Sequence, residues 1–244
     1  MILNFVNFIK EKISYHKELC QDIWNGDVIK EKIKNKLLTI SKDFFEDVDL
    51  DTDIIDIQFL GSMVNFNFND ESDIDVHIII DFSDVNDDID LVKKVVDGAK
   101  FEWNTHHKIS LRGHDVELYI QDKDEKVSSS GIYSILNDEW VQKPKYNPPK
   151  VTDEDINPKY NSYVNDINQL EKVTKEETDV DELKKYYERA KEIKKKLGDA
   201  RKIGVKEKGE FSIENLVFKK LRNEGFIGKL IEVKNGLYDK MFAQ

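Results

Sequence analysis

Two aspartates separated by one residue, Asp73 and Asp75, open a β-branched, apolar run that ends at Ile80. Alternate residues of a β-strand project to the same face, so these two carboxylates and His77 are expected on one side of a strand. Two carboxylates about 7 Å apart along a strand repel each other, and a divalent cation removes that cost. The spacing therefore predicts a metal site at Asp73 and Asp75. The alternative is a pair that caps a turn and faces solvent.

A Gly-Ser pair, Gly61 and Ser62, stands upstream of the two aspartates. Glycine lets the backbone approach a ligand closely, and the serine offers an amide and a hydroxyl to phosphate oxygens. The alternative is a pair that only ends a strand. Because this pair precedes Asp73 and Asp75 in a β-branched context, we expect it to bind phosphate next to the metal.

A third carboxylate follows in a later apolar run. Glu117 lies between Val116 and Leu118, which embed it in a predicted strand. Asp115 lies two residues earlier on the same strand face and is the alternative third ligand. For His77 we expect a hydrogen-bonded, partly buried side chain outside the catalytic set.

The segment from Phe59 to Phe82 reads FLGSMVNFNFNDESDIDVHIIIDF, and it resembles the DNA polymerase beta-type nucleotidyltransferase superfamily. That family's pattern is an apolar residue before Gly-Ser, a spacer, two aspartates separated by one residue and flanked by apolar residues, and a third acidic residue on a neighbouring strand. Leu60 and Glu117 supply the first and the last of these features. The resemblance covers about residues 28–121.

A looser resemblance links three segments to unassigned nucleotidyltransferase-like proteins predicted in tailed-phage genomes. The segments are FLGSMVNFNFNDESDIDVHIIIDF, VELYIQD and GEFSIENLVFKKLR. This second resemblance implies little about the substrate.

The resemblance to the superfamily implies an enzyme, a nucleotidyltransferase that moves a nucleotidyl group from an NTP such as ATP to an acceptor and releases pyrophosphate. It implies that Asp73 and Asp75 bridge two Mg²⁺ or Mn²⁺ ions, and that Glu117 helps to hold the ion that activates the acceptor hydroxyl. Ser62 and the amides around it would hold the β- and γ-phosphates. The acceptor stays open between RNA, a protein side chain, a small molecule and another nucleotide.

The alternative function is a catalytically silent nucleotidyltransferase-like module that binds a nucleotide or a partner, as an antitoxin-like subunit does. Three intact carboxylates favour the enzyme, because a pure binding module has no physical need for clustered negative charge.

Further nucleotide contacts are expected from two other segments. Ser129 and Tyr133 follow the third carboxylate strand, where enzymes of the resembling family often place hydroxyls and an aromatic ring near the nucleotide. The alternative for this segment is a flexible turn that enters a helix. Lys219 and Lys220, together with Arg222, are expected to reach a triphosphate across a cleft between domains, and the alternative is a solvated basic helix.

The elements that must position these residues follow from apolar periodicity. Helices are expected over residues 28–45 and 89–103, and strands over residues 54–60, 74–80, 108–111 and 115–121. In this order they predict an α+β fold. Its catalytic domain, residues 1–143, would be a nucleotidyltransferase-like mixed sheet with flanking helices.

The rest of the chain divides at its prolines, all four of which lie between Pro144 and Pro158. Residues 144–158 are expected to form an extended strap. Helical spacing beyond the strap predicts a smaller helical C-terminal domain over residues 159–244, with Ser212 as an N-cap. The Lys- and Glu-rich residues 171–182 are expected to be a mobile loop.

The formal net charge of −11 argues against a surface that binds nucleic acid without sequence preference, because such a surface would repel phosphates. The charges are uneven along the chain. Residues 46–97 hold sixteen acidic and two basic residues, whereas residues 183–222 hold fourteen basic and six acidic ones. The first region is expected to hold cations and the second phosphates, and the alternative is two solvated faces.

Cys20 is the only cysteine, which excludes a disulfide framework and a zinc cluster of thiolates within one chain. Residues 1–13 lack the apolar stretch of a signal peptide, and no apolar run reaches membrane-spanning length. We therefore expect a cytoplasmic protein without a membrane partner. The sequence leaves its oligomeric state open.

Overall fold

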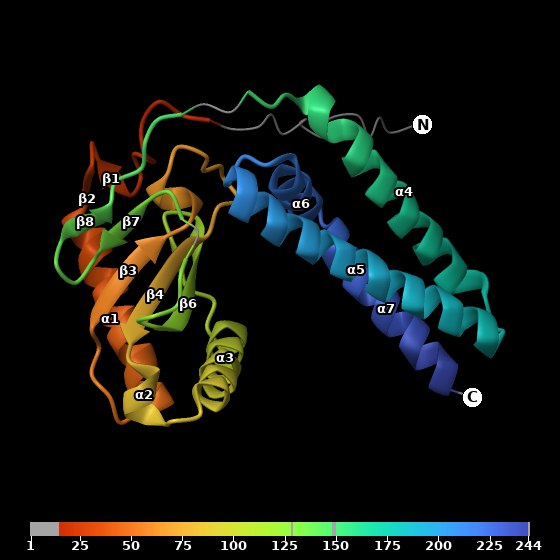
Figure 1. Cartoon of the computed structure of the whole chain (residues 1–244), viewed down its shortest axis with the longest axis horizontal. Helices are drawn as coiled ribbons and strands as arrows, with labels where there is room; N and C mark the ends of the chain where they lie inside the picture. The colour runs from red at the N-terminus through yellow and green to blue at the C-terminus, as the bar shows by residue number, and fades with distance from the viewer. Residues whose placement is uncertain (1–14, 128, 148–149, 244) are drawn as a thin grey trace, which may run out of the picture. The chain divides into compact units, whose positions relative to one another are not determined.

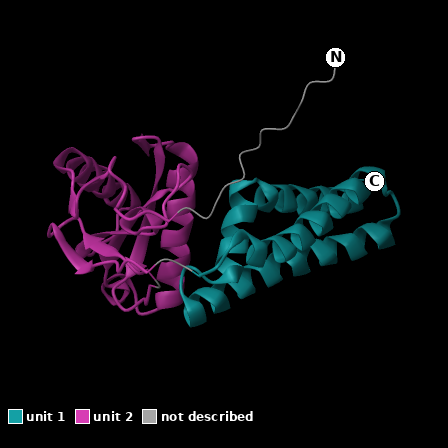
Figure 2. Ribbon diagram, turned by 90° about the horizontal axis from the view of Figure 1, so that it is seen from above, with its two compact units in different colours: residues 1–13, 149–244 teal, residues 14–148 magenta. Residues whose placement is uncertain are grey.

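The computed structural model describes residues 15–127, 129–147 and 150–243. These residues divide into two compact units, one of residues 15–147 and one of residues 150–243. The first unit combines a mixed β-sheet with helices, and helices build the second (Figure 1). Figure 2 shows the two units in different colours. The chain is therefore α+β, as its sequence predicts.

The described residues of the first unit form both strands and helices. They are β1 (Trp24–Asn25), β2 (Val28–Ile29), α1 (Glu31–Val48), β3 (Asp56–Leu60), the 3-10 helix η1 (Ser62–Val64), β4 (Ile74–Ile80), α2 (Phe82–Val85), α3 (Ile89–His106), β5 (Ser110–Leu111), β6 (His114–Asp122), β7 (Ile132–Ser134) and β8 (Glu139–Gln142).

The main sheet of this unit has the strand order β5-β6-β4-β3-β7-β8 among the described residues. β4 and β6 run parallel, and the other neighbouring strands run antiparallel. Parallel neighbours need a crossover connection, and α3 lies in the connection from β4 to β6 (Figure 1). β1 and β2 form a separate two-stranded ribbon.

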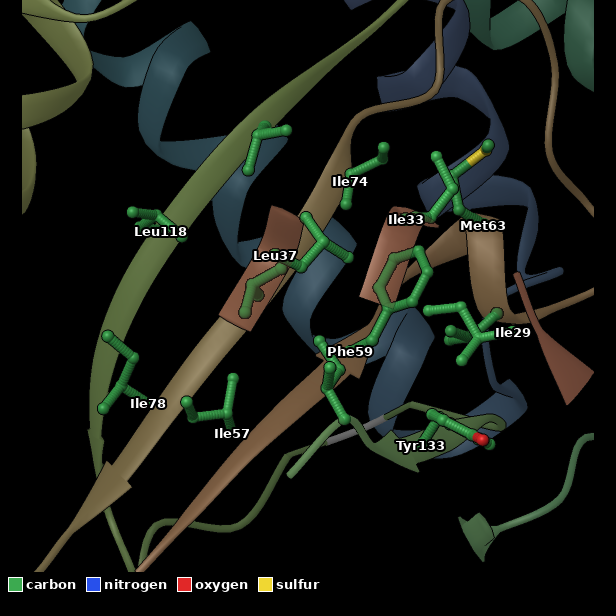
Figure 3. Packing of buried hydrophobic residues seen from close by; sticks show 14 of the residues in the cluster. Ile29, Ile33, Leu37, Ile57, Phe59, Met63, Ile74, Ile78, Leu118 and Tyr133 are labelled. Atoms are coloured by element: carbon green, nitrogen blue, oxygen red, sulfur yellow. The ribbon is translucent and has the colours of Figure 1, made fainter. Parts of the chain in front are cut away.

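One face of the sheet is apolar and packs against helices. Ile74 lies opposite Val116 and Val76 opposite Leu118 in the parallel pair, and all four side chains are buried. Figure 3 shows side chains from β3, β4, β6 and α1 meeting in this core. The helices contribute the buried residues Ile33, Leu37, Phe44, Val92 and Val96.

This apolar layer fixes the register of β4 against β6. Burial of one such aliphatic side chain is worth about 1.5–3 kcal/mol. A slip of one residue would turn every apolar side chain of a strand to the other face. The residues that alternate with the core are therefore held in defined positions on the opposite face.

The strands and helices predicted in this unit are largely confirmed. β3 lies within the predicted strand of residues 54–60, and β4 coincides with the predicted strand of residues 74–80. α3 covers the helix predicted over residues 89–103, and β5 and β6 form where two strands were expected.

The start of α1 differs from the prediction. The helix begins at Glu31, and Val28 and Ile29 instead form β2, which pairs with β1 across a turn at Gly26. Gly26 has a φ of +64°, a conformation that glycine adopts without strain. A β-branched pair next to a glycine turn therefore joins a hairpin instead of the first helical turn.

β7 and β8 were not predicted from apolar periodicity. Residues 129–131 lead into the strand β7, so the alternative of a turn that enters a helix is wrong. Ser128 lies outside the described residues.

The second unit consists of α4 (Asp153–Glu176), α5 (Val180–Lys208), α6 (Ile213–Asn223) and α7 (Phe226–Phe242) in its described part. Its core is formed by buried residues of all four helices, including Ile167, Leu197, Leu221 and Leu237. The side chain of Ser212 accepts a hydrogen bond from the backbone of Asn215, so the predicted N-cap is confirmed.

Two predictions about the connecting segments were wrong. α4 begins at Asp153, so residues 153–158 of the expected strap are helical. The side chains of Thr152 and Asp155 form a capping box there, and Pro158 lies inside the helix. Residues 171–176 belong to α4 and residues 180–182 to α5, so most of the expected mobile loop is helical.

No helix in the described part of the chain is long and apolar enough to cross a membrane. The prediction about a signal peptide concerns residues 1–13, which lie outside the described residues.

Candidate functional site

The face of the sheet opposite the apolar core is polar where β4 and β6 meet. Asp75 of β4 lies opposite Glu117 of β6, and His77 lies opposite Tyr119 in the next row. All four side chains are partly buried. Neighbouring strands lie about 4.8 Å apart, so the fold brings the predicted carboxylates Asp75 and Glu117 to adjacent positions. Asp73 directly precedes β4.

The register distinguishes between the two candidates for the third carboxylate. Glu117 lies directly opposite Asp75. Asp115 is exposed and pairs with Ser110 in the antiparallel β5–β6 ladder. The geometry therefore favours Glu117 as the partner of Asp75.

The Gly61-Ser62 turn packs directly on Asp75. Gly61 has a φ of +83°, and a Cβ atom there would overlap Oδ2 of Asp75 and lie 3.1 Å from its Cγ. Leu60, the residue before Gly61, pairs with Asp75 in the β3–β4 ladder. The Gly-Ser pair thus brings the turn after β3 against Asp75 of β4, and its predicted contact with phosphate stays a prediction.

A hydrogen-bond network fixes the backbone just before Asp73. The Ser62 hydroxyl donates to the Ser72 hydroxyl oxygen at 2.9 Å, and the backbone amide of Asn69 donates to the same oxygen at 2.9 Å. The carbonyl of Ser72 accepts a hydrogen bond from Nδ1 of His114 at 2.7 Å. A carbonyl can only accept, so Nδ1 of His114 carries a proton. The hydrogen bonds of Ser62 and His114 therefore stabilise the turn that directly precedes Asp73.

Glu117 is held by Tyr119 from the same strand. The Tyr119 hydroxyl donates to Oε2 of Glu117 at 2.5 Å. Burial raises the pKa of Tyr119 well above its usual value, and the charge of Asp75 and the hydrogen bond to Glu117 add to the rise. The phenol therefore keeps its proton at neutral pH and acts as a donor.

Lys100 of α3 lies over the Tyr119 ring, with its ammonium nitrogen 3.3 Å from the ring centroid. Burial lowers the pKa of Lys100, and the negative charges of Glu117, Asp97 and Asp75 act in the opposite direction. A lysine side chain therefore contributes positive charge beside the carboxylates.

His77 is partly buried and hydrogen-bonded, as expected. Its ring stacks on Tyr119 with centroids 4.5 Å apart, and its Nδ1 lies 2.6 Å from Oε1 of Gln121. The amide nitrogen of Gln121 donates to the carbonyl of Glu125 at 3.1 Å, which turns Oε1 toward the histidine. Nδ1 of His77 is therefore the donor. Burial lowers the pKa of His77, so the neutral ring is favoured.

The oxygen donors on this face are of the kind that a hard divalent cation binds. Asp75 and Glu117 are neighbours across the strands, and Asp73 lies at the entrance of β4. In the conformation described, Asp75 packs on Gly61 and Glu117 accepts from Tyr119. Across residues 15–127, 129–147 and 150–243, no three carboxylate, imidazole or thiol groups are arranged as a ready metal site.

Tyr133 contributes to the core of the first unit. Its side chain is 2% exposed, and its ring contacts Trp24 and Trp140 edge-on. Its hydroxyl donates to Oδ1 of Asp138 at 2.6 Å. These contacts direct the Tyr133 hydroxyl to Asp138.

Ser129 lies in the loop before β7, and its hydroxyl donates to the carbonyl of Gly131 at 2.7 Å. The neighbouring Ser130 accepts a hydrogen bond from Asn65, which follows η1. The loop therefore packs beside the segment that begins with Gly61 and Ser62. A nucleotide contact of Ser129 or Tyr133 stays a prediction.

Lys219 and Lys220 lie on α6 in the helical unit. Lys220 donates to Oδ1 of Asn157 at 3.1 Å, and its ammonium nitrogen lies 4.6 Å from the centroid of the Tyr160 ring. Both partners belong to α4, so Lys220 stabilises the packing of two helices. The predicted contact of Lys219 and Lys220 with a triphosphate stays a prediction.

The residues of this site that were not identified from the sequence include Ser72, Lys100, His114 and Tyr119. Tyr119 follows Glu117 by two residues, so it shares the strand face of that carboxylate. Lys100 follows the buried Val92 and Val96 at four-residue intervals, a spacing that places a charged residue beside the buried face of α3. These two spacings were the signals that the sequence offered.

No protein-family model, no curated protein and no solved structure matches this chain.

Proposed function

We propose that this protein is a nucleotidyltransferase that moves a nucleotidyl group from an NTP to an acceptor in a reaction that depends on a divalent cation. The observation that carries the proposal is the pairing of Asp75 with Glu117 across two parallel strands, on the polar face of the sheet, with Asp73 at the strand entrance. The acceptor is RNA, a protein side chain, a small molecule or another nucleotide.

The order of elements supports a nucleotidyltransferase-like sheet. The chain runs from β3 through the Gly61-Ser62 turn into β4, and then through α3 into β6. The resemblance to the polymerase beta-type superfamily requires Gly-Ser before the aspartates and a third acidic residue on a neighbouring strand. Glu117 meets that requirement because β6 pairs with β4.

In the proposed reaction, an acceptor oxygen forms a bond to the α-phosphorus of the NTP. The bond from the α-phosphorus to the oxygen that bridges to the β-phosphate breaks, and pyrophosphate leaves with that electron pair. The acceptor proton passes to solvent. No covalent intermediate with the protein is required.

Each residue of the site has a defined task in this proposal. Asp73, Asp75 and Glu117 would hold Mg²⁺ or Mn²⁺, two ions as the resemblance implies. When bound, such ions neutralise phosphate charge and favour deprotonation of an acceptor hydroxyl. Gly61 brings the backbone close to the carboxylates. Because the Ser62 hydroxyl donates to Ser72, we assign the β- and γ-phosphates to the backbone amides of this turn.

A second candidate is the catalytically silent module that binds a nucleotide or a partner. The observation that favours it is the positive charge of Lys100 beside Tyr119 and Glu117. A cation from the chain itself lets the carboxylates stay together without a bound metal ion.

Incubation with each α-labelled NTP tests the enzyme against the silent module. Reactions contain Mg²⁺ or Mn²⁺ and, as acceptors, RNA, a nucleotide or the protein itself, and are assayed for pyrophosphate and a labelled product. Wild type is expected to release pyrophosphate, and the isosteric variant Asp75→Asn is expected not to. NTP binding without turnover under every condition would favour the silent module.

A further inference from the structure

A chain of contacts joins α3 to the candidate carboxylates. The Lys100 ammonium nitrogen lies 3.3 Å from the Tyr119 ring centroid, and the Tyr119 hydroxyl donates to Glu117 at 2.5 Å. The first contact is a cation–π interaction and the second a hydrogen bond to a carboxylate. Lys100 therefore acts on Glu117 both directly, through charge, and through the tyrosine between them.

The Lys100 ammonium group lies against an aromatic ring beside the carboxylates. Lysine normally extends its ammonium group into water, whereas Lys100 is partly buried, in line with the core residues Val92 and Val96. Burial disfavours its charged form, and the charges of Glu117 and Asp75 favour it. Because Coulomb attraction is mutual, the ammonium group also lowers the cost of gathering these carboxylates.

We propose that Lys100 and Tyr119 are positioning residues of the carboxylate site: Tyr119 fixes the orientation of Glu117, and Lys100 supplies the counter-charge when no divalent cation is bound. The inference rests on the proposed function, since it assigns to these two residues an effect on the cation affinity of the same site. The two side chains have opposite effects on that affinity. Lys100 repels a divalent cation, whereas the Tyr119 hydrogen bond orients one of its ligands.

Mn²⁺ titration of the full chain, followed by the electron paramagnetic resonance of free Mn²⁺, measures both effects. Lys100→Gln is expected to bind Mn²⁺ roughly 3–10-fold more tightly at low ionic strength. Tyr119→Phe is expected to bind it about 10–100-fold more weakly, as for other residues that orient a metal ligand. A role in packing alone would weaken binding in both variants.

Two matched controls accompany these variants. Lys94→Gln removes an exposed lysine from the same helix, and Tyr160→Phe removes a tyrosine hydroxyl that donates to Glu224 in the helical unit. Both are expected to bind Mn²⁺ within about twofold of wild type, because neither contacts the carboxylate face. Unchanged or weaker binding in Lys100→Gln would overturn the role of Lys100, and unchanged binding in Tyr119→Phe that of Tyr119.

A double-mutant cycle in metal-free protein separates this inference from the proposed function. The Tm of Lys100→Gln, relative to its parent, is expected to be less favourable in the wild-type background than in Glu117→Gln, because the attraction to that carboxylate is lost only in the first background. Equal changes of Tm in both backgrounds would overturn the coupling. A wild type that binds no Mn²⁺ would overturn the metal-dependent function, whereas the cycle would still decide whether Lys100 is coupled to Glu117.

Discussion

The carboxylate of Asp75 fills the space that a Cβ atom at Gly61 would need, so the turn after β3 packs directly against this residue of β4. Gly61 also has a φ of +83°, which side-chain-bearing residues rarely adopt. Glycine is therefore favoured at this position by its backbone conformation, and an added Cβ atom would also make the Asp75 side chain shift.

Gly61→Ala is expected to destabilise the fold and to displace Asp75. Gly113→Ala is the matched control, because Gly113 has a φ of +90° but nothing within 4 Å of an added Cβ. Both variants bear the conformational strain, and only Gly61→Ala adds the overlap, which is worth about 1–3 kcal/mol. Urea unfolding measures the difference between the two. Equal losses of unfolding free energy would show that Asp75 moves aside without cost.

His114→Ala is expected to loosen the turn before Asp73. The buried carbonyl of Ser72 loses its hydrogen bond from His114, and an unsatisfied buried polar group costs about 1–3 kcal/mol. His114→Asn keeps a donor at a similar position and is expected to recover part of that loss. The exposed His106→Ala serves as the control. A loss in His114→Ala no larger than in His106→Ala would contradict this role.

The pairing of the carboxylates could be anticipated because local sequence determines it. Asp75 and Glu117 each alternate with buried apolar residues, and this alternation defines both the strands and the face on which the acids lie. Parallel pairing of β4 and β6 follows from the helix between them. The sequence left the choice between Glu117 and Asp115 open, since both share one face, and the register decides which acid lies opposite Asp75.

The features of the fold and of the site that could not be predicted depend on tertiary contacts or on local signals that outweigh composition. Tyr119 and Lys100 meet only after α3 packs beside β6. The short strand β7 has too few residues to show a period. Pro158 suggested an extended strap, but the capping box at Thr152 starts a helix ahead of it. Pro158 lies within α4, between Ile156 and Tyr160, which are buried in the core of the helical unit.

Substitution of Lys219, Lys220 and Arg222 by Ala tests the predicted phosphate contacts of α6. We expect weaker binding of triphosphate or acceptor, seen as a KM raised roughly tenfold, and a smaller effect on Tm. Lys220→Ala alone is the control for packing, since Lys220 contacts Asn157 and Tyr160. An unchanged KM for both substrates in the triple variant would show that α6 is a solvated basic helix.

Mg²⁺ together with an NTP is expected to raise the Tm of the wild type. A ligand that binds only the folded state stabilises it by about 2.7 kcal/mol at a hundredfold excess over Kd. Thermal shifts with ATP, GTP, CTP and UTP, each with and without Mg²⁺, measure the effect. Addition of EDTA should remove the metal-dependent part. Shifts near zero for all four nucleotides at millimolar concentration would contradict nucleotide binding.

The role of Asp75 separates a catalytic metal site from a structural cap. If Asp75 gathers with Asp73 and Glu117 to bind a cation, three carboxylates share the single counter-charge of Lys100 in metal-free protein, and net repulsion remains there. Asp75→Asn is then expected to lose turnover by about a thousandfold, the loss of several kcal/mol of metal-assisted stabilisation. Its metal-free Tm should be equal or slightly higher. A capping aspartate predicts the reverse, with Asp75→Ala losing about 0.5–2 kcal/mol of stability while turnover largely survives.

Glu117→Gln and Asp115→Asn complete this comparison, since all variants are assayed for turnover and for metal-free Tm. Glu117→Gln is expected to match Asp75→Asn in turnover, because Glu117 lies opposite Asp75. Asp115→Asn should retain turnover, because Asp115 is exposed and pairs with Ser110. Loss of turnover in Asp115→Asn but not in Glu117→Gln would keep the mechanism and move the third ligand by two residues. Retained turnover in Asp75→Asn with a lower Tm would refute the metal-dependent mechanism itself.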